Sequence, residues 1–514
     1  MDAGIGLARG LRRPSAGSRL YRNLTTSEGI QLTLAINDPN LLGLHTVRPK
    51  QFANNGSRFT VTNPATGLPI ADVTDFNIAH VREAVETAYV ARPGWSSRTA
   101  DERCSIMLRW SALMRENIED LSAILTSEMG KPLEEARGEI LYAASYIDWF
   151  AEEGRRIYGD IVPAHGNSKR IFVLKQPVGV AAIITPWNFP AAMIARKAAP
   201  ALAAGCSIVV RPSELTPLSA LAMAVLAERA GVPAHVFQVL PSTDAAGVGM
   251  EFCRNPKIRK LSFTGSTRVG SLLMQQAAGD LKRLSLELGG NAPFVVFEDA
   301  DLDKAVEGVL LAKFRNAGQT CVCANRIYVH RRVTDLFAQK LCDAIRKLNV
   351  GNGMSPGVQI GPLISSQAMT KVEEHIQDAV QHGASLRLGG RRHPLGGTYF
   401  EPTLLTGVTQ DMKIAREETF GPVAPLFAFD TFDEVIERAN DSEYGLAAYF
   451  YTRDLSQAWK FAEALEYGMV GINTAAISTA QAPFGGIKQS GFGREGSKYG
   501  INEYLEMKYL CLEI

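Results

Sequence analysis

The chain has almost no net charge, since 54 Lys and Arg residues stand against 53 Asp and Glu residues, which gives a formal charge of +1. Binding to nucleic acid or to an anionic membrane by bulk electrostatics needs a basic excess, so neither partner is expected. Cysteines are also few: there are seven, an odd number, and only Cys321 and Cys323 stand close together. This usage argues against a disulfide framework and fits a reducing compartment.

Long apolar runs are missing as well. The stretches 178–184 and 198–210 are cut by Gly, Pro or polar residues, whereas a membrane-spanning helix needs about 18 apolar residues or more. The sequence therefore predicts a soluble protein with a small-molecule partner and no metal site. Its 514 residues exceed the roughly 250–300 over which a single core grows, so two or three domains are expected.

The N-terminus is the one segment with a strong bias. Residues 1–27 carry five arginines, several Ser and Thr, and Asp2 as the only acid. This composition is typical of a mitochondrial transit peptide, so we expect a targeting arm and a matrix location. The glycines and Pro14 of the same segment equally fit a disordered basic tail on a cytoplasmic protein.

Hydrophobic periodicity predicts an α/β chain. After an irregular segment at 28–60, apolar residues recur at helical spacing, and from residue 178 short apolar strands alternate with amphipathic helices. Repeated βαβ units imply a parallel sheet covered by helices on both faces, with ligands at the carboxyl ends of the strands. The expected helices are 78–89, 101–129, 133–153, 191–204, 218–230, 302–314, 336–348 and 369–382, and the expected strands are 178–184, 207–210, 236–240, 260–263, 326–329, 426–430 and a terminal edge strand at 504–512.

Polar and glycine-rich turns follow three of these strands. They are Thr185-Pro-Trp-Asn-Phe-Pro190, Arg211-Pro-Ser-Glu214 and Thr264-Gly-Ser-Thr-Arg-Val-Gly270. The last has the spacing Gly-x-x-x-x-Gly, and Ser266 is suited to cap the helix that follows. The start of such a helix can hold a diphosphate through its backbone N–H groups, although similar turns often serve only the fold.

A thiol and a carboxylate are the candidate reactive pair. Cys321 stands among small and polar residues, and Glu287 lies 34 residues earlier, between two leucines and before two glycines. A thiolate nucleophile with a carboxylate base is the minimum for covalent acyl chemistry with a water-activating step. Taken alone the pair is weak evidence, because most cysteines are small buried hydrophobes and most glutamates are solvated.

Five motifs, in this order, carry a resemblance. Thr185-Pro-Trp-Asn-Phe-Pro190, Phe263-Thr-Gly-Ser266, Leu286-Glu-Leu-Gly-Gly290, Gly318-Gln-Thr-Cys321 and Glu417-Glu-Thr-Phe-Gly-Pro422 together resemble the NAD(P)-dependent aldehyde dehydrogenase superfamily. The resemblance spans residues 61–512. Within the superfamily the chain looks most like the succinate-semialdehyde dehydrogenases, on the strength of Cys321-Val-Cys323, Arg196-Lys197, Arg315 and the tail 493–505.

The resemblance implies the architecture. We expect a Rossmann-like NAD(P)-binding domain from 28–160 and 175–288, a second α/β catalytic domain over 289–480, and a small β oligomerisation element from 161–174 and 481–514. The terminal strand of that element would pair with or be covered by another subunit. A homo-oligomer, dimer or tetramer, is therefore expected.

It also implies the site. Cys321 would attack the aldehyde, the Asn188 side chain and the Cys321 backbone N–H would hold the oxyanion, and Glu287 would activate the hydrolytic water. The far carboxylate of the substrate would bind Arg196, Arg315 and Ser478, since Arg–carboxylate pairs are charge-assisted. Cofactor-lining positions would be Trp187, Arg211, Glu214, Gly265, Ser266, Gly270, Glu418 and Phe420.

The sequence leaves alternatives open for both the cofactor and the substrate. Arg211 stands where the family usually has Lys and favours the 2′-phosphate of NADP, whereas Glu214 favours the free ribose of NAD, so we expect both to be used. A carboxylate pocket separates succinate semialdehyde from glutarate semialdehyde only by length, and an uncharged aliphatic aldehyde is the alternative if Arg315 has no such role. Cys323 is a candidate redox partner of Cys321, or a thiol that only packs.

Two functions of other classes compete. A cysteine hydrolase would need a His that orients the thiol, yet none of the eight His residues lies in a motif with Cys321. A non-catalytic protein of the same fold would be expected to have lost Cys321 or Glu287, and both are present. The resemblance therefore implies oxidation of succinate semialdehyde to succinate, as in 4-aminobutyrate degradation.

Overall fold

The fold comes from a computed structural model that describes residues 24–25, 31–32, 34, 36–42 and 57–514. Except for residues 24–25, the predicted targeting arm at 1–27 lies outside the described residues. Among the described residues, no helix is both long and apolar enough to cross a bilayer.

A six-stranded sheet forms the first half of the molecule, in the order β21-β11-β10-β7-β8-β9. Its strands from β11 to β9 run parallel and β21 is antiparallel. Every residue of β7 and β8 is buried, as expected for parallel strands with both faces covered. The strands are β7 (Val180–Ile184), β8 (Ser207–Arg211), β9 (Phe237–Val239), β10 (Ile258–Thr264), β11 (Arg283–Glu287) and β21 (Gly491–Phe492).

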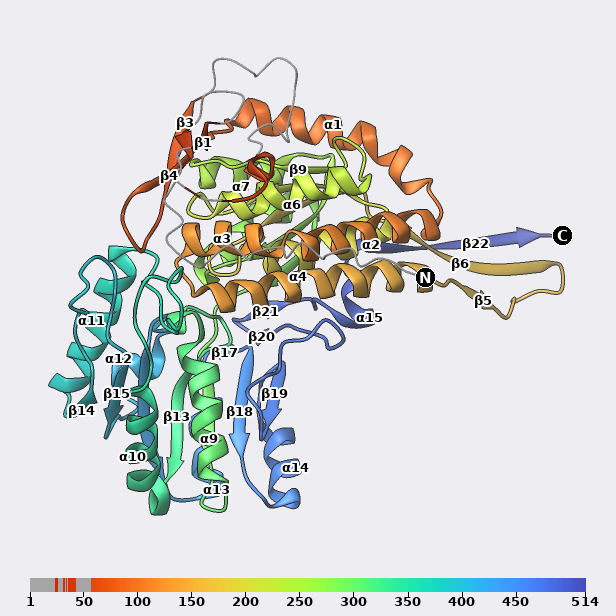
Figure 1. The fold of residues 1–514 in the computed structure, drawn as a ribbon. Coiled ribbons are helices and arrows are strands. Elements are labelled where there is room, and N and C mark those ends of the chain that lie inside the picture. Colours follow the sequence, from red (N-terminus) through yellow and green to blue (C-terminus); the bar gives the residue numbers. More distant parts are fainter. Residues whose placement is uncertain (1–23, 26–30, 33, 35, 43–56) are drawn as a thin grey trace, which may run out of the picture.

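Helices cover both faces of this sheet (Figure 1). Their apolar faces join two clusters of buried residues, one on each side of the strands. This confirms the predicted α/β class and the parallel sheet. The helices are α1 (Ile78–Ser96), α2 (Ala100–Glu116), α3 (Ile118–Met129), α4 (Leu133–Glu153), α5 (Ala192–Ala204), α6 (Pro217–Ala230), α7 (Ala245–Arg254) and α8 (Thr267–Ala277).

The prediction of a single helix over 101–129 is wrong. The segment forms two helices, α2 and α3, separated at Asn117, whose backbone leaves the helical region at φ −101° and ψ 21°. The Asn117 side chain donates to the Leu113 carbonyl at 2.8 Å and so satisfies an acceptor at the end of α2. Apolar periodicity continues across the break, which is why the spacing alone did not show it.

A seven-stranded sheet forms the second half, in the order β14-β15-β16-β13-β12-β18-β19. Only the β14–β15 pair is antiparallel in this sheet. Its core includes Phe297, whose ring meets those of Phe450 and Phe461 edge to face. The strands are β12 (Ala292–Val296), β13 (Ala324–His330), β14 (Ser385–Leu388), β15 (Thr403–Thr406), β16 (Val423–Phe429), β18 (Ala447–Tyr451) and β19 (Met469–Ile472).

The helix predicted over 302–314 is α-helical only to Val309. A π-helical turn, η4 (Leu310–Phe314), continues it toward the predicted nucleophile. Such turns are frequent at functional sites. The α-helices of this half are α9 (Leu302–Val309), α10 (Thr334–Ile345), α11 (Ser366–Gln381), α12 (Lys413–Arg416), α13 (Phe432–Asn440) and α14 (Leu455–Ala464).

A three-stranded antiparallel sheet, β22-β6-β5, extends away from the body (Figure 1). Its strands are β5 (Asp160–Val162), β6 (Lys169–Pro177) and β22 (Leu505–Glu513), and β22 is an edge strand, as predicted. Apolar side chains are exposed on it, Ile161 at 81% and Met507 at 77%. The division of the chain into cofactor, catalytic and oligomerisation units stays a prediction.

Short elements complete the described chain. The remaining ones, all brief, connect the sheets or begin the chain: β1 (Leu24–Thr25), β2 (Gln31–Leu32), β3 (Arg58–Thr62), β4 (Pro69–Thr74), β17 (Tyr444–Gly445), β20 (Ile487–Lys488), α15 (Ser497–Gly500), and the helical turns η1 (Pro39–Leu42), η2 (Gly154–Arg156), η3 (Ala278–Asp280), η5 (Arg315–Gly318), η6 (Arg331–Val333) and η7 (Ile501–Tyr504).

Candidate active site

Cys321 lies in the turn between η5 and β13, and its side chain is partly exposed. The glycine pair after Glu287 reaches this turn, because a Cβ on Gly290 would lie 2.4 Å from the Cys321 carbonyl oxygen. Burial among protein atoms raises the pKa of the Cys321 thiol to about 12, against the opposing charges of Arg196 and Arg315. The thiol is therefore protonated at neutral pH and needs a proton acceptor before it attacks.

Glu287 ends strand β11, in register with Thr264 of β10. The side chain is buried, and neither carboxyl oxygen has a hydrogen-bond partner in the described part of the chain. Burial raises the pKa of Glu287 well above its usual value, the neighbouring Glu495 adds to the shift, and Arg196 opposes it. A buried carboxyl with a raised pKa and free oxygens is a stronger proton acceptor than an exposed one.

Asn188 follows β7, and its side chain is hydrogen-bonded to the turn that carries Cys321. Its Nδ2 donates to the Gln319 carbonyl at 3.1 Å, two residues before Cys321. The backbone carbonyl of Asn188 accepts from Lys131 Nζ at 2.8 Å and from Asn316 Nδ2 at 3.1 Å. An amide nitrogen carries two hydrogens, so Nδ2 keeps a second donor for an oxyanion beside the thiol.

The start of helix α8 adjoins the Glu287 loop. Ser266 caps the helix by accepting from the Val269 N–H at 3.4 Å, as predicted. A Cβ on Gly270 would lie 2.5 Å from Leu288 Cδ2, so a glycine there allows α8 to approach the loop closely. Gly265, which precedes the cap, leaves the backbone of this turn uncovered by a side chain of its own. The free N–H groups of the first turn suit an anionic group such as a diphosphate.

Glu418 and Phe420 border the same region. Glu418 accepts from the Gly290 N–H at 3.2 Å, and a Cβ on Gly289 would lie 3.0 Å from its other oxygen. Burial raises the pKa of Glu418 to about 7. Phe420, at φ 56°, meets the ring of Trp187 edge to face at 5.5 Å. These rings link the segment after Glu418 to the turn that carries Asn188.

Arg211 and Glu214 form an ion pair at the end of β8. The Arg211 Nη2 lies 2.7 Å from a Glu214 oxygen and also donates to the Ser242 carbonyl at 2.9 Å. The Arg211 Nε is buried and has no hydrogen-bond partner among the described residues. The donors and acceptors present therefore fit a ribose or a ribose phosphate at this end of the sheet.

The three predicted carboxylate-binding residues differ in their surroundings. Arg315 is partly buried over the ring of Phe189, and in the described chain it has no carboxylate partner. Arg196 is buried instead, at 2.6 Å from Glu495 and over the ring of Phe484. Ser478 is partly exposed between β19 and β20. Arg315 is thus the cation whose charge is available to an incoming carboxylate.

Cys323 is buried and lies apart from solvent. Its sulfur accepts from Lys313 Nζ at 3.4 Å, and that amine also donates to Asn325 at 2.9 Å. Burial raises the pKa of the Cys323 thiol, and Lys313 opposes the shift. Both Cys321 and Cys323 are free thiols here. A disulfide between them stays a prediction.

Sequence reasoning predicted Arg196 but missed the roles of its charged neighbours Lys197 and Glu495. Glu495 pairs with both Arg196 and Lys197, and Lys197 also donates to Thr264 at 2.6 Å. Lys197 and Glu495 are 298 residues apart, so no local pattern connects them. The signal that existed was two adjacent cations inside an otherwise apolar helix, α5.

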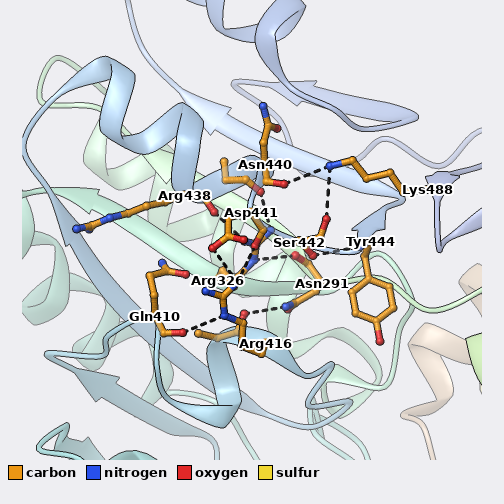
Figure 2. Close-up of polar contacts among 12 residues, drawn as sticks. Asn291, Arg326, Gln410, Arg416, Arg438, Asn440, Asp441, Ser442, Tyr444 and Lys488 are labelled. Atoms are coloured by element: carbon orange, nitrogen blue, oxygen red, sulfur yellow. Dashed lines mark hydrogen bonds and ion pairs between the residues drawn. The ribbon is translucent and has the colours of Figure 1, made fainter.

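A second missed residue, Arg326, supports the loop after Glu287. This buried arginine donates to the Asn291 carbonyl at 3.0 Å and to the Ala439 carbonyl at 2.9 Å (Figure 2). The Asn291 side chain in turn donates to the Ala415 carbonyl at 3.0 Å. An arginine inside the buried strand β13 was the available signal, because a buried guanidinium requires several acceptors.

Fold and site together define a class: an α/β protein in which a partly exposed cysteine, a buried carboxyl and a side-chain amide lie near a helix start suited to a dinucleotide. In the described residues no group of His, Cys, Asp or Glu side chains could hold a metal ion.

The chain belongs to the aldehyde dehydrogenase family, whose sequence pattern matches residues 52–510. It is 58% identical over 481 residues to the NADP(+) succinate-semialdehyde dehydrogenase of Escherichia coli (strain K12), covering 93% of this chain and 100% of that one. It is 59% identical over 461 residues to a glutarate-semialdehyde dehydrogenase of Pseudomonas aeruginosa, covering 90% and 95%. The crystal structure of a succinate-semialdehyde dehydrogenase from Burkholderia pseudomallei superposes with a TM-score of 0.90 at 56% identity, covering 93% and 100%.

Proposed function

We propose that the protein oxidises succinate semialdehyde to succinate with NAD+ or NADP+. The observation that carries the substrate is Arg315, a cation six residues before Cys321 with no carboxylate partner among the described residues. An aldehyde with a distal carboxylate would supply that partner through charge-assisted hydrogen bonds. The relatives named for succinate semialdehyde support the same substrate.

The chemistry starts at Cys321. The partly exposed Cys321 thiol gives its proton to solvent water. The resulting thiolate attacks the aldehyde carbon, and the carbonyl oxygen becomes the alkoxide of a thiohemiacetal. The second hydrogen of Asn188 Nδ2 and the Cys321 backbone N–H donate to that oxygen and stabilise the charge that develops on it. A bound nicotinamide would supply the acceptor for the hydride that leaves the former aldehyde carbon, and a thioester would then remain on Cys321.

Glu287 then serves the hydrolytic step. Its carboxylate accepts a proton from a water molecule, which attacks the thioester carbon. The thiolate of Cys321 leaves and succinate is released. The raised pKa of Glu287 suits a group that must take up a proton from water and later give it back.

Cofactor binding is assigned to the α8 start, the Arg211–Glu214 pair and Glu418. Ser266 would present its backbone N–H to the diphosphate. Gly265, whose own N–H donates to the Glu287 carbonyl at 3.1 Å, would leave room for the ligand, and Glu418 would accept from the nicotinamide ribose hydroxyls. Because Glu214 is paired with Arg211 at 2.7 Å, neither charge dominates, which supports use of both NAD and NADP.

Glutarate semialdehyde is the second candidate substrate, because a relative named for it is 59% identical. Both substrates carry the carboxylate that Arg315 would bind, and they differ by one methylene. Purified protein should be assayed with both semialdehydes and with butanal, following the absorbance of reduced cofactor. The highest kcat/KM with succinate semialdehyde supports the proposal, and a preference for butanal refutes a carboxylate-binding site.

Assembly and location complete the proposal. The exposed apolar side chains of β5 and β22 favour a homo-oligomer, dimer or tetramer, formed through the three-stranded sheet; light scattering would measure its mass. The Arg-rich residues 1–27 favour import into the mitochondrial matrix, where the reaction would act in 4-aminobutyrate degradation. A tagged chain that lacks residues 1–27 should then stay in the cytosol.

A further inference from the structure

The turn before the nucleophile has an unusual backbone. Asn316 (φ 54°, ψ 34°) and Ala317 (φ 53°, ψ 32°) are consecutive left-handed residues, followed by Gly318 at φ 76°. Only the glycine adopts this conformation without steric cost. Strained residues of this kind persist when surrounding contacts hold them, and they cluster at functional sites.

The turn lies between the proposed carboxylate-binding residue and the proposed nucleophile. Arg315, the proposed receptor of the substrate carboxylate, precedes the left-handed pair, and Cys321 follows it by four residues. A change in this backbone would therefore move both the cation and the thiol. Their separation has to match the length of the substrate, since orientation errors of about 1 Å cost large factors in rate.

One side chain from another element holds the start of the pair. Glu135 in the first turn of α4 accepts from the Asn316 backbone N–H at 2.8 Å. The other bonds of Asn316 stay within the site: its Nδ2 donates to the carbonyls of Asn188, at 3.1 Å, and Gln319, at 3.2 Å. Glu135 is thus the anchor that ties the turn to the helix layer.

Burial raises the pKa of Glu135 to about 7, against the charges of two nearby cations. Lys131 and Arg315 both act electrostatically on this carboxyl. Lys131 already has its own ion pair, with Glu139 at 2.6 Å. No ion pair joins Glu135 to Arg315 in the described part of the chain, so the guanidinium stays available for a ligand.

We propose that Glu135 is a positioning residue whose hydrogen bond to the Asn316 N–H maintains the left-handed turn and thereby sets the distance between Arg315 and Cys321. The proposal rests on the proposed function for the role of Arg315. It adds a residue that touches neither substrate nor nucleophile but acts on both through one backbone.

The first test compares three variants of one helix. Glu135→Ala removes the acceptor and should lower kcat/KM for succinate semialdehyde roughly tenfold or more, the scale of a lost charged hydrogen bond. Glu135→Gln keeps an acceptor oxygen at the same reach and should restore most of that loss. The matched control is Glu134→Gln, because Glu134 is an exposed neighbour that pairs with Arg137 outside the site.

The second test relieves the strain itself. Ala317→Gly removes the Cβ that disfavours φ 53°, so Glu135→Ala should cost several-fold less in that background than in the parent. Equal losses in both backgrounds, or a Glu135→Gln variant as impaired as Glu135→Ala, would overturn the proposal. If Glu135→Ala does not fold, Glu135→Asp tests the same bond, since it keeps the charge but withdraws the oxygen by one methylene.

A substrate-free readout separates this proposal from the proposed function. The rate at which iodoacetamide alkylates Cys321, followed by peptide mass spectrometry, should change several-fold in Glu135→Ala and stay unchanged in Glu134→Gln. A parent protein inactive on succinate semialdehyde refutes the substrate but leaves this measurement intact. An alkylation rate that Glu135→Ala leaves unaltered refutes the positioning role, whatever the substrate.

Discussion

Arg315 is the residue on which the substrate proposal depends most. Its Nε is buried without a hydrogen-bond partner in the described chain, and its guanidinium lies 5.4 Å from the centre of the Phe189 ring. A substrate carboxylate bound there would form a charge-assisted pair worth about 1.5–3 kcal/mol. Arg315→Gln should therefore raise KM for succinate semialdehyde by roughly 10- to 150-fold. Because Arg315 is partly exposed, solvent screening favours the lower part of that range.

Two comparisons make the Arg315 assay specific. Butanal has the same carbon chain without the carboxylate, so its KM should be the same for Arg315→Gln and the parent. Arg331→Gln is the matched control, because Arg331 is an exposed arginine paired with Asp430 at 2.7 Å on the surface. Steady-state rates of reduced-cofactor formation give both constants. An unchanged KM for succinate semialdehyde in Arg315→Gln would show that the carboxylate binds elsewhere.

Three further predictions address the cofactor, the base and the second thiol. Glu214→Gln removes the carboxylate that pairs with the Arg211 guanidinium at 2.7 Å. The ratio of kcat/KM for NADP to that for NAD should then rise about tenfold or more. An unaltered ratio in parallel assays would be inconsistent with the pair controlling cofactor choice. The pKa of Glu287 is higher in the folded than in the unfolded state, so the folded protein binds a proton at Glu287 more tightly. As pH rises above about 4.5, the ionisation of Glu287 therefore lowers the free energy of unfolding. Glu287→Gln should accordingly raise Tm more at pH 8 than at pH 5 while abolishing steady turnover, and a Tm gain independent of pH would contradict the shift. Loss of activity in peroxide that dithiothreitol restores should disappear in Cys323→Ala; if it persists, Cys323 has no part in the redox response.

Local sequence signals were enough for the sheet and for the groups at strand ends. The apolar strands and the helices between them were expected close to their observed bounds, and α4 was placed at Leu133–Glu153. Arg211 ends a strand, and Asn188 and Ser266 follow two other strands of the same parallel sheet, so all three lie at its carboxyl edge. The geometry of that fold made these positions predictable.

What the sequence did not show depends on contacts between distant segments. The position of Glu495 beside Arg196 and Lys197, and of Glu135 beside Asn316, follows only from tertiary packing. The left-handed backbone at Asn316 and Ala317 had no local signal either, since Gly318 is the only glycine of the three. The break at Asn117 was hidden because the apolar stripe continues across it.

The most direct test of the account is the covalent state of Cys321 during the reaction. The Glu287→Gln protein should be mixed with succinate semialdehyde and NADP+, acid-quenched and mapped by peptide mass spectrometry. The account predicts a succinyl thioester that accumulates on Cys321, because the thiol still reacts while the hydrolytic base is missing. A Cys321 peptide that stays unmodified while reduced cofactor forms would contradict it.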